Sequence, residues 1–203
     1  MLKKFAIVLF CGFLTISSHA QNFGGGVILG LGASQVGGDN LAGFHKAGWL
    51  LGAFANTSIS ELLSFQMEMT FIQKGSDNPN MNDYPHQPDI SSSYIEIPLL
   101  LQYHQSNKLK IEGGLLSAYL IDAYYNDLIG KIPIHTVNPF IKYDFGLLLG
   151  IDYTFSNKLS LNTRLSNSIL PIGTEDYNHP NTYNSSRKGK YNSVLSFALH
   201  YNF

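Results

Sequence analysis

Charged residues recur at positions that an alternating strand would place on one side of a sheet. In the segment 62–74, Ser64, Gln66, Glu68 and Thr70 alternate with large apolar residues, and successive side chains of a strand point to opposite faces. The same parity assigns eight charged residues to the polar faces of their strands: Glu68, Glu96, Lys110, Glu112, Lys142, Asp144, Asp152 and Arg164. Acids and bases enclosed together form ion pairs or, where water reaches them, a path for ions or protons.

The width of the enclosing structure favours one of these two roles. If the strands close into a barrel of eight, its interior is only wide enough for side chains. We therefore interpret the eight charged residues as a paired polar core that fills the lumen. A proton or ion path is the alternative.

Four histidines lie in four different predicted loops: His45, His86, His135 and His179. Imidazole nitrogen is a common ligand of zinc, so these side chains would form a metal site if the loops converged at one mouth. Separate loops need not converge, however, and histidine is common on polar, exposed segments. We expect no metal site and no cofactor.

The usual catalytic signatures are absent from the sequence. It contains no Gly-x-Ser-x-Gly elbow, no His-Glu-x-x-His helix motif and no phosphate-binding loop. A hydrolase that uses Asp83 or Asp176 with His86 or His179 remains an alternative, because an acid and a histidine can exchange protons. We expect a protein that is not an enzyme.

The elements that would position these side chains are strands. Alternation predicts eight of them, at 24–36, 47–58, 62–74, 93–104, 109–120, 139–154, 159–170 and 191–203. Short connections at 59–61, 105–108 and 156–158 alternate with long ones at 37–46, 75–92, 121–138 and 171–190. This pattern predicts an all-β fold, an eight-stranded antiparallel up-and-down transmembrane β-barrel with short periplasmic turns and longer extracellular loops.

Aromatic residues at the ends of the apolar faces support a membrane position. Tyr143 and Tyr153 share one face, as do Tyr191 and Tyr201, and the chain stops on Phe203. Ten strand residues tilted by about 40° rise roughly 25 Å, which is the height of the lipid-facing band of such barrels. We interpret these five residues as parts of two interfacial girdles, although chance spacing among twelve tyrosines is the alternative.

The first twenty residues read as a secretory signal peptide. Lys3 and Lys4 precede the apolar run 5–16, and Ser18 and Ala20 suit cleavage after Ala20. The expected division is a signal peptide at 1–20 and a barrel domain at 21–203, which contains no cysteine. Removing two lysines leaves eleven basic residues against fourteen acidic ones, a net charge of −3, so nucleic acid is not an expected partner.

Pro98 conflicts with its place in the fourth predicted strand. Proline cannot donate a ladder hydrogen bond, and a closed barrel has no free edge. We predict a β-bulge at Pro98, which would shift the inward or outward direction of the residues beyond it.

Four segments together resemble one known family. They are Ser34–Trp49, Gln73–Ser76, Tyr94–Leu101 and Phe145–Gly150, and they look like the PorT-like outer-membrane β-barrel family over residues 24–203. The resemblance implies an eight-stranded barrel in the outer membrane of a Gram-negative cell. One member of that family is tied to protein secretion, but no residue here carries that role over.

Two functions that are not enzymatic follow from these patterns. The first is a structural, anchoring or binding protein of the outer membrane, with possible links to secretion or transport, whose long loops carry five tyrosines suited to binding: Tyr84, Tyr124, Tyr125, Tyr177 and Tyr183. The second is a soluble, lipocalin-like periplasmic barrel that binds an apolar ligand inside. For the first, we expect outer-membrane lipid as the surroundings, the barrel assembly machinery as a partner of the C-terminal strand, and a monomer.

Overall fold

The computed structural model describes residues 23–39, 41, 43–80, 88–127, 130–133, 140–173 and 189–203. These residues form nine strands: β1 (Phe23–Gly37), β2 (Lys46–Ser58), β3 (Leu63–Ser76), β4 (Asp89–His104), β5 (Leu109–Asp127), β6 (Gly130–Pro133), β7 (Tyr143–Ser156), β8 (Leu159–Ser168) and β9 (Tyr191–Asn202). Among the described residues there is no helix long and apolar enough to cross a membrane. The predicted signal peptide lies outside the described residues and stays a prediction.

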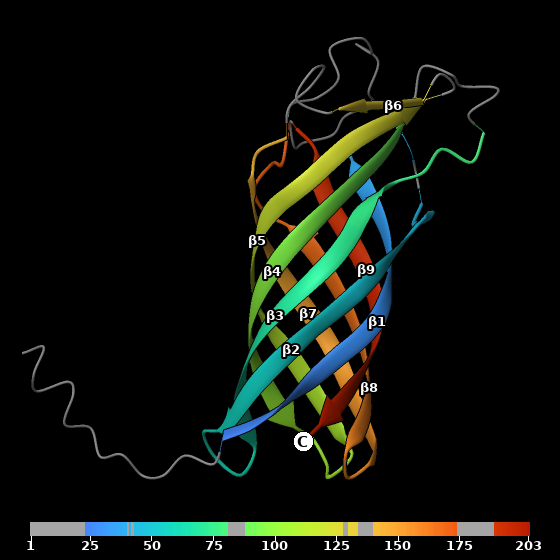
Figure 1. Cartoon of the computed structure of the whole chain (residues 1–203). Coiled ribbons are helices and arrows are strands. Elements are labelled where there is room, and N and C mark those ends of the chain that lie inside the picture. The colour runs from blue at the N-terminus through green and yellow to red at the C-terminus, as the bar shows by residue number, and fades with distance from the viewer. Residues whose placement is uncertain are drawn as a thin grey trace, which may run out of the picture.

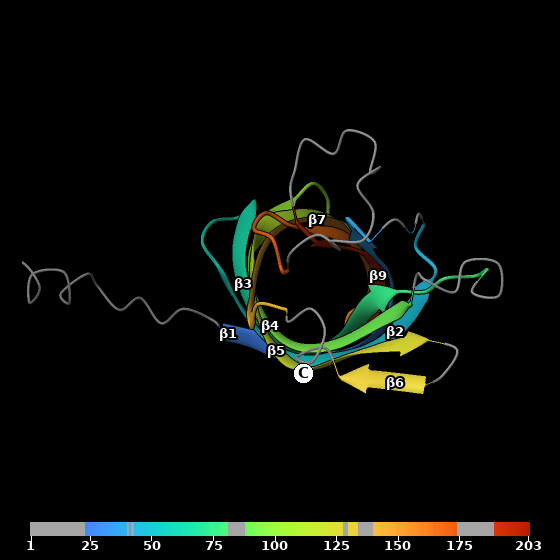
Figure 2. The same ribbon diagram turned by 90° about the horizontal axis from the view of Figure 1, so that it is seen from above.

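The strands close into a barrel. All neighbouring pairs are antiparallel, the sheet order is β4-β3-β2-β1-β9-β8-β7-β5-β6, and an additional pairing of β4 with β5 completes the ring. Eight strands therefore form the wall, which confirms the predicted fold class. The short β6 pairs with the far end of β5 and lies outside the ring in the view along the axis (Figure 2).

The two ends of the barrel differ in their connections, as Figure 1 shows. Tight turns join β2 to β3, β4 to β5 and β7 to β8 at the end where the C-terminus lies. The ring closes at this end through the last residue, because the amide of Phe203 donates to the carbonyl oxygen of Gly25 at 3.0 Å. In outer-membrane barrels such short turns mark the periplasmic end.

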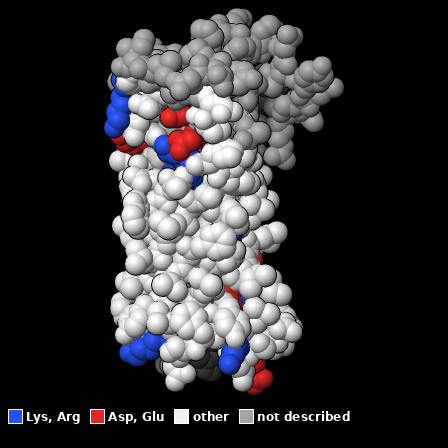
Figure 3. Space-filling view, turned by 90° about the vertical axis from the view of Figure 1, so that its right-hand side faces the viewer, with Lys and Arg blue, Asp and Glu red and all other residues white. Residues whose placement is uncertain are grey.

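The burial pattern reverses that of a soluble protein. Charged and amide side chains are buried inside, whereas large apolar side chains are exposed around the wall, among them Leu29, Leu51, Met69, Leu101, Leu115, Leu147, Leu149, Ile151, Leu165, Phe197 and Leu199. Figure 3 shows this wall as a broad band without charge between two charged ends. Such a band matches the lipid-facing surface of a membrane barrel. A lipocalin has the opposite arrangement, with a polar exterior and an apolar lumen.

One predicted loop is largely strand. The segment 121–138 was expected to be a long connection, but β5 continues to Asp127 and β6 pairs back onto it, with Tyr124 opposite Pro133 and Asp127 opposite Gly130. The alternation of inward and outward residues is interrupted in this segment, because the pairing of β4 with β5 shifts register between Ser93 and Tyr94. A bulge of this kind changes which parity faces inward.

The predicted bulge at Pro98 is wrong. The β3–β4 ladder runs from Thr70 opposite Glu96 to Met67 opposite Leu99 without any change of register, so only the pairings at Pro98 and its neighbour are missing. Leu99 remains exposed on the lipid side. The strand therefore tolerates a missing donor locally, and the bulge lies at Ser93 and Tyr94 instead.

Candidate functional site

The lower half of the lumen is centred on Arg164, which projects inward from β8. Its Nη1 and Nη2 atoms each lie 2.6 Å from one carboxylate oxygen of Glu68 on β3, and its Nε donates to Glu112 on β5. Gln102 and Asn162 also donate to Glu112, at 3.0 and 2.8 Å. One guanidinium thus holds two carboxylates across the barrel, a geometry for which its planar fork is suited.

A second charge cluster fills the lumen nearer the extracellular end. Lys74 on β3 forms an ion pair with Glu96 on β4, and its Nζ lies 3.6 Å from Oδ2 of Asp144 on β7. Asn192 donates to the same oxygen at 2.9 Å, and the Lys74 ammonium lies 5.0 Å from the centroid of the Tyr94 ring. Every one of these side chains is buried.

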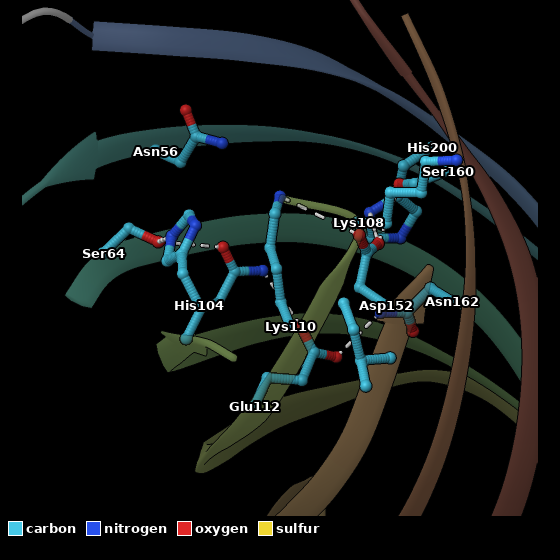
Figure 4. A network of polar contacts seen from close by, with 12 residues as sticks. Asn56, Ser64, His104, Lys108, Lys110, Glu112, Asp152, Ser160, Asn162 and His200 are labelled. Atoms are coloured by element: carbon cyan, nitrogen blue, oxygen red, sulfur yellow. Dashed lines mark hydrogen bonds and ion pairs between the residues drawn. The ribbon is translucent and has the colours of Figure 1, made fainter. Parts of the chain in front are cut away.

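A third polar group, drawn in Figure 4, lies toward the periplasmic turns. Asp152 accepts from Ser160 at 2.8 Å and has the Lys110 Nζ and the His200 Nδ1 each at 3.8 Å. Beside it, Ser64 and His104 are joined at 2.8 Å. The described residues contain no group of three or more His, Cys, Asp or Glu side chains placed to hold a metal ion.

Layers of apolar side chains also fill the lumen, between the charged groups. Leu100, Leu116 and Leu148 pack together inside, and a larger cluster surrounds Tyr94 and Ile72. A cavity of about 20 Å³ remains beside Arg164, Thr70 and Glu96, room for about one water molecule.

The extracellular end of the lumen is closed by a different cluster, built around Lys190. This lysine is fully buried, its Nζ donates to the Tyr125 hydroxyl at 3.0 Å, and the ring centroid of Phe140 lies 5.6 Å away. Ile172 packs with both rings. The amide of Ile172 donates to the Lys190 carbonyl oxygen at 2.8 Å, so the chain after β8 and the chain before β9 complete the inner surface.

Asp39 lies just beyond β1 at this mouth and is also buried. Its Oδ1 accepts from the Leu41 amide at 2.9 Å. Burial raises the pKa of Asp39 to about 6, although hydrogen bonding and the Lys190 charge oppose the shift. Asp39 therefore takes up a proton in a mildly acidic medium.

The structure places most of the predicted polar core inside the barrel. Buried are Glu68, Glu96, Glu112, Asp144, Asp152 and Arg164, while Lys110 is half-buried beside Asp152. The prediction for Lys142 is wrong: this residue is exposed, in a bend that precedes β7. The inward parity of β7 begins only at Asp144, and the bend lies opposite the bulged region of β5.

Among the buried ionisable residues that were not in the predicted core are Lys74, His200 and Lys190. Lys74 and His200 have inward parity on β3 and β9, so alternation alone would have found both. Lys190 precedes β9 in a predicted loop, and no strand pattern could have placed it inside. The ring of His200 stacks on Phe54 at 5.3 Å between centroids.

Only one of the four loop histidines lies among the described residues. His45 is exposed on the extracellular side, while His86, His135 and His179 lie outside the described residues. The same is true of Asp83 and Asp176, the acids of the alternative hydrolase, and of Tyr84, Tyr177 and Tyr183. Tyr125 is not the exposed binding residue that the sequence suggested, because its side chain is buried and its hydroxyl accepts a hydrogen bond from Lys190.

The predicted girdle residues lie on the outer surface. Tyr143, Tyr153, Tyr201 and Phe203 are exposed, and Tyr191 is half-buried. Tyr143 packs edge to face with Tyr119 near the extracellular end, and Tyr201 does so with Phe203 at the periplasmic end. These positions suit two aromatic girdles, one at each lipid interface.

Comparison with known proteins agrees with this geometry. Residues 17–172 match the family described as outer membrane protein beta-barrel domain. The chain belongs to this family. This outer-membrane barrel has no significant match among curated proteins.

Solved structures of Ail show the same fold in another outer-membrane barrel. The structure of Ail, the attachment invasion locus protein of Yersinia pestis, is 10% identical with a TM-score of 0.55, covering 89% of this chain and 98% of Ail. Ail in complex with the heparin analogue sucrose octasulfate is 9% identical with a TM-score of 0.54, covering 89% and 99%. Neisserial surface protein A is 14% identical with a TM-score of 0.49, covering 89% and 97%.

The family and the exposed apolar wall together place this protein in the outer membrane, in contact with lipid. The alternative of a soluble, lipocalin-like barrel is therefore wrong. It required an apolar lumen and a polar exterior, whereas here the lumen contains Arg164, Glu68 and Glu112 and the exterior is apolar.

Proposed function

We propose that this outer-membrane barrel is a structural or binding protein that acts through its extracellular end, and that it is neither a channel nor an enzyme. The observation that carries the proposal is the filled lumen. Arg164, Glu68 and Glu112 form a buried ionic bridge across the barrel, and a second bridge involves Lys74. Because these side chains fill the lumen, only the outer surfaces of the barrel remain available to bind a partner.

The extracellular end offers a suitable surface. The β5–β6 hairpin continues beyond the ring of strands, and among the described residues β6 pairs only with β5. The exposed Lys131 on β6 lies 4.4 Å from the Tyr124 ring centroid. A hairpin that extends beyond the ring with an aromatic and cationic surface can contribute to binding a partner protein.

The narrower roles rest on resemblance. Kinship with PorT-like barrels would link the protein to secretion or an envelope complex, and the name of Ail links a barrel of this fold to attachment. The heparin analogue is bound by Ail itself, at 9% identity to this chain. The name of Ail supports a binding role for a barrel of this fold.

Site-directed cross-linking in whole cells tests the proposal. The predicted mature chain has no cysteine, so a single cysteine at Lys131 carries a photoreactive label on the β5–β6 hairpin. The matched control is a cysteine at Glu61, exposed in the β2–β3 turn. We expect a discrete cross-linked product from Lys131→Cys and none from Glu61→Cys.

The opposite pattern would contradict the proposal. Equal labelling of many proteins from both positions would indicate random contact, and a discrete product from Glu61→Cys alone would move the binding surface to the periplasmic end. Heat modifiability of each variant on a gel confirms that the barrel has folded.

A further inference from the structure

The three described periplasmic turns share one backbone geometry. In each, the carbonyl oxygen of the last turn residue accepts from the next barrel strand: Leu62 from His104 at 2.9 Å, Lys108 from Thr154 at 2.8 Å and Lys158 from Asn202 at 2.8 Å. Leu62, Lys108 and Lys158 therefore occupy equivalent positions at the periplasmic end of the barrel.

Each of these places adjoins an outward tyrosine. The residue that follows the turn is paired with Tyr103, Tyr153 or Tyr201 in the neighbouring strand: Leu63 with Tyr103, Leu109 with Tyr153 and Leu159 with Tyr201. All three tyrosines are exposed on the outer surface. Tyrosine in this position lies at the level of the lipid headgroups.

The three equivalent places differ in charge. Two of them carry the exposed lysines Lys108 and Lys158, whereas the third carries Leu62, which is 54% exposed and follows Glu61. The ammonium of Lys158 lies 5.6 Å from the centroid of the Tyr201 ring. Basic side chains also gather at the lower end of the wall in Figure 3, below the uncharged band.

We propose that Lys108 with Tyr153, and Lys158 with Tyr201, bind the phosphate groups of anionic glycerophospholipids in the inner leaflet of the outer membrane. The lysine stem covers apolar surface while its ammonium reaches the phosphate, and the tyrosine hydroxyl lies at the same depth. The β2–β3 turn lacks such a site, because Leu62 has no charge. This proposal requires the membrane position but not the extracellular partner.

Native mass spectrometry of the folded barrel tests it. The protein is reconstituted in nanodiscs of equal parts phosphatidylcholine and phosphatidylglycerol, and the lipids retained after mild release are counted. One lysine near a membrane surface contributes about a fivefold preference for anionic lipid. We expect up to two retained phosphatidylglycerol molecules, one fewer in Lys108→Ala or Lys158→Ala, and none above background in the double variant.

Two matched variants keep the test decisive. Lys142→Ala removes an exposed lysine at the opposite end and should leave retention unchanged. Leu62→Lys places an ammonium at the third equivalent position and should add one retained phosphatidylglycerol. Equal retention of both lipids by the unaltered barrel, or unchanged retention in the double variant, would overturn the proposal, and so would the lack of any gain with Leu62→Lys.

Discussion

The guanidinium of Arg164 and the carboxylate of Glu68 face each other across the lumen and are joined by two parallel contacts of 2.6 Å each. Arg164 is on β8 and Glu68 on β3, so the pair connects opposite parts of the wall. Both side chains are almost completely buried. The Arg164–Glu68 ion pair therefore occupies part of the lumen and links opposite strands of the barrel.

Removing the Arg164 guanidinium should leave the buried carboxylates of Glu68 and Glu112 without their cationic partner. We expect Arg164→Ala to lower the free energy of unfolding by about 3–5 kcal/mol, the cost of breaking a buried ion pair on one side. The free energy of unfolding of Arg164→Lys should lie between those of Arg164→Ala and the unaltered protein, since lysine keeps the positive charge but lacks the planar guanidinium fork. Urea unfolding in lipid vesicles, followed by fluorescence of the single tryptophan, Trp49, measures the difference.

The control for this series is the exposed Lys142. Lys142→Ala should change the unfolding free energy by no more than about 0.5 kcal/mol. An Arg164→Ala barrel that unfolds at the same urea concentration as the unaltered protein would show that the ionic bridge does not stabilise the fold.

Acidification should stabilise the extracellular mouth through Asp39. Its pKa rises from 3.8 to about 6 on folding, so the folded protein binds this proton more tightly than the unfolded chain does. The stabilisation is complete below pH 3.8 and is lost as the pH rises through 6. Two pKa units correspond to at most about 3 kcal/mol.

Unfolding at a series of pH values, compared with Asp39→Asn, isolates this contribution. The difference in unfolding free energy between the two proteins should change between pH 3.8 and 6 and be constant on either side. A constant difference across the whole range would show that Asp39 has its ordinary pKa in the folded protein.

A side chain at Gly114 should not fit the wall. An added Cβ there would lie 2.0 Å from the carbonyl oxygen of Leu99, whereas one at Gly37 would have its nearest neighbour at an ordinary 3.7 Å. We expect Gly114→Ala to cost about 1–3 kcal/mol through backbone displacement and Gly37→Ala to be tolerated. The fraction of heat-modifiable barrel after refolding measures both, and equal yields would contradict the close packing of β4 against β5.

Alternation predicted the wall of the barrel because each strand has one face in lipid and one inside. It located Glu68, Asp144 and Arg164 on the inner face. It could not give their partners, since these depend on the register between strands far apart in the sequence. Lys74, which joins Glu96 to Asp144, became recognisable as a partner only when the strands were in place.

The same rule was wrong where the strands are irregular. Lys142 has the parity of Asp144 but lies in a bend, and the bulge in the β4–β5 pairing follows from tertiary register and not from Pro98. Lys190 is inside because the chain before β9 returns into the mouth and bonds to Gly173 and Tyr125. Local sequence contains no information on such a return.

Single-channel recording in planar lipid bilayers tests the central claim most directly. The purified barrel, shown to be folded by heat modifiability, should insert without stable conductance steps, because Arg164 and Lys74 each hold carboxylates across the lumen. The Arg164→Ala and Lys74→Ala double variant should be more permeable if the folded barrel survives. Stable, large steps from the unaltered protein would contradict the account and show that the lumen is a pore.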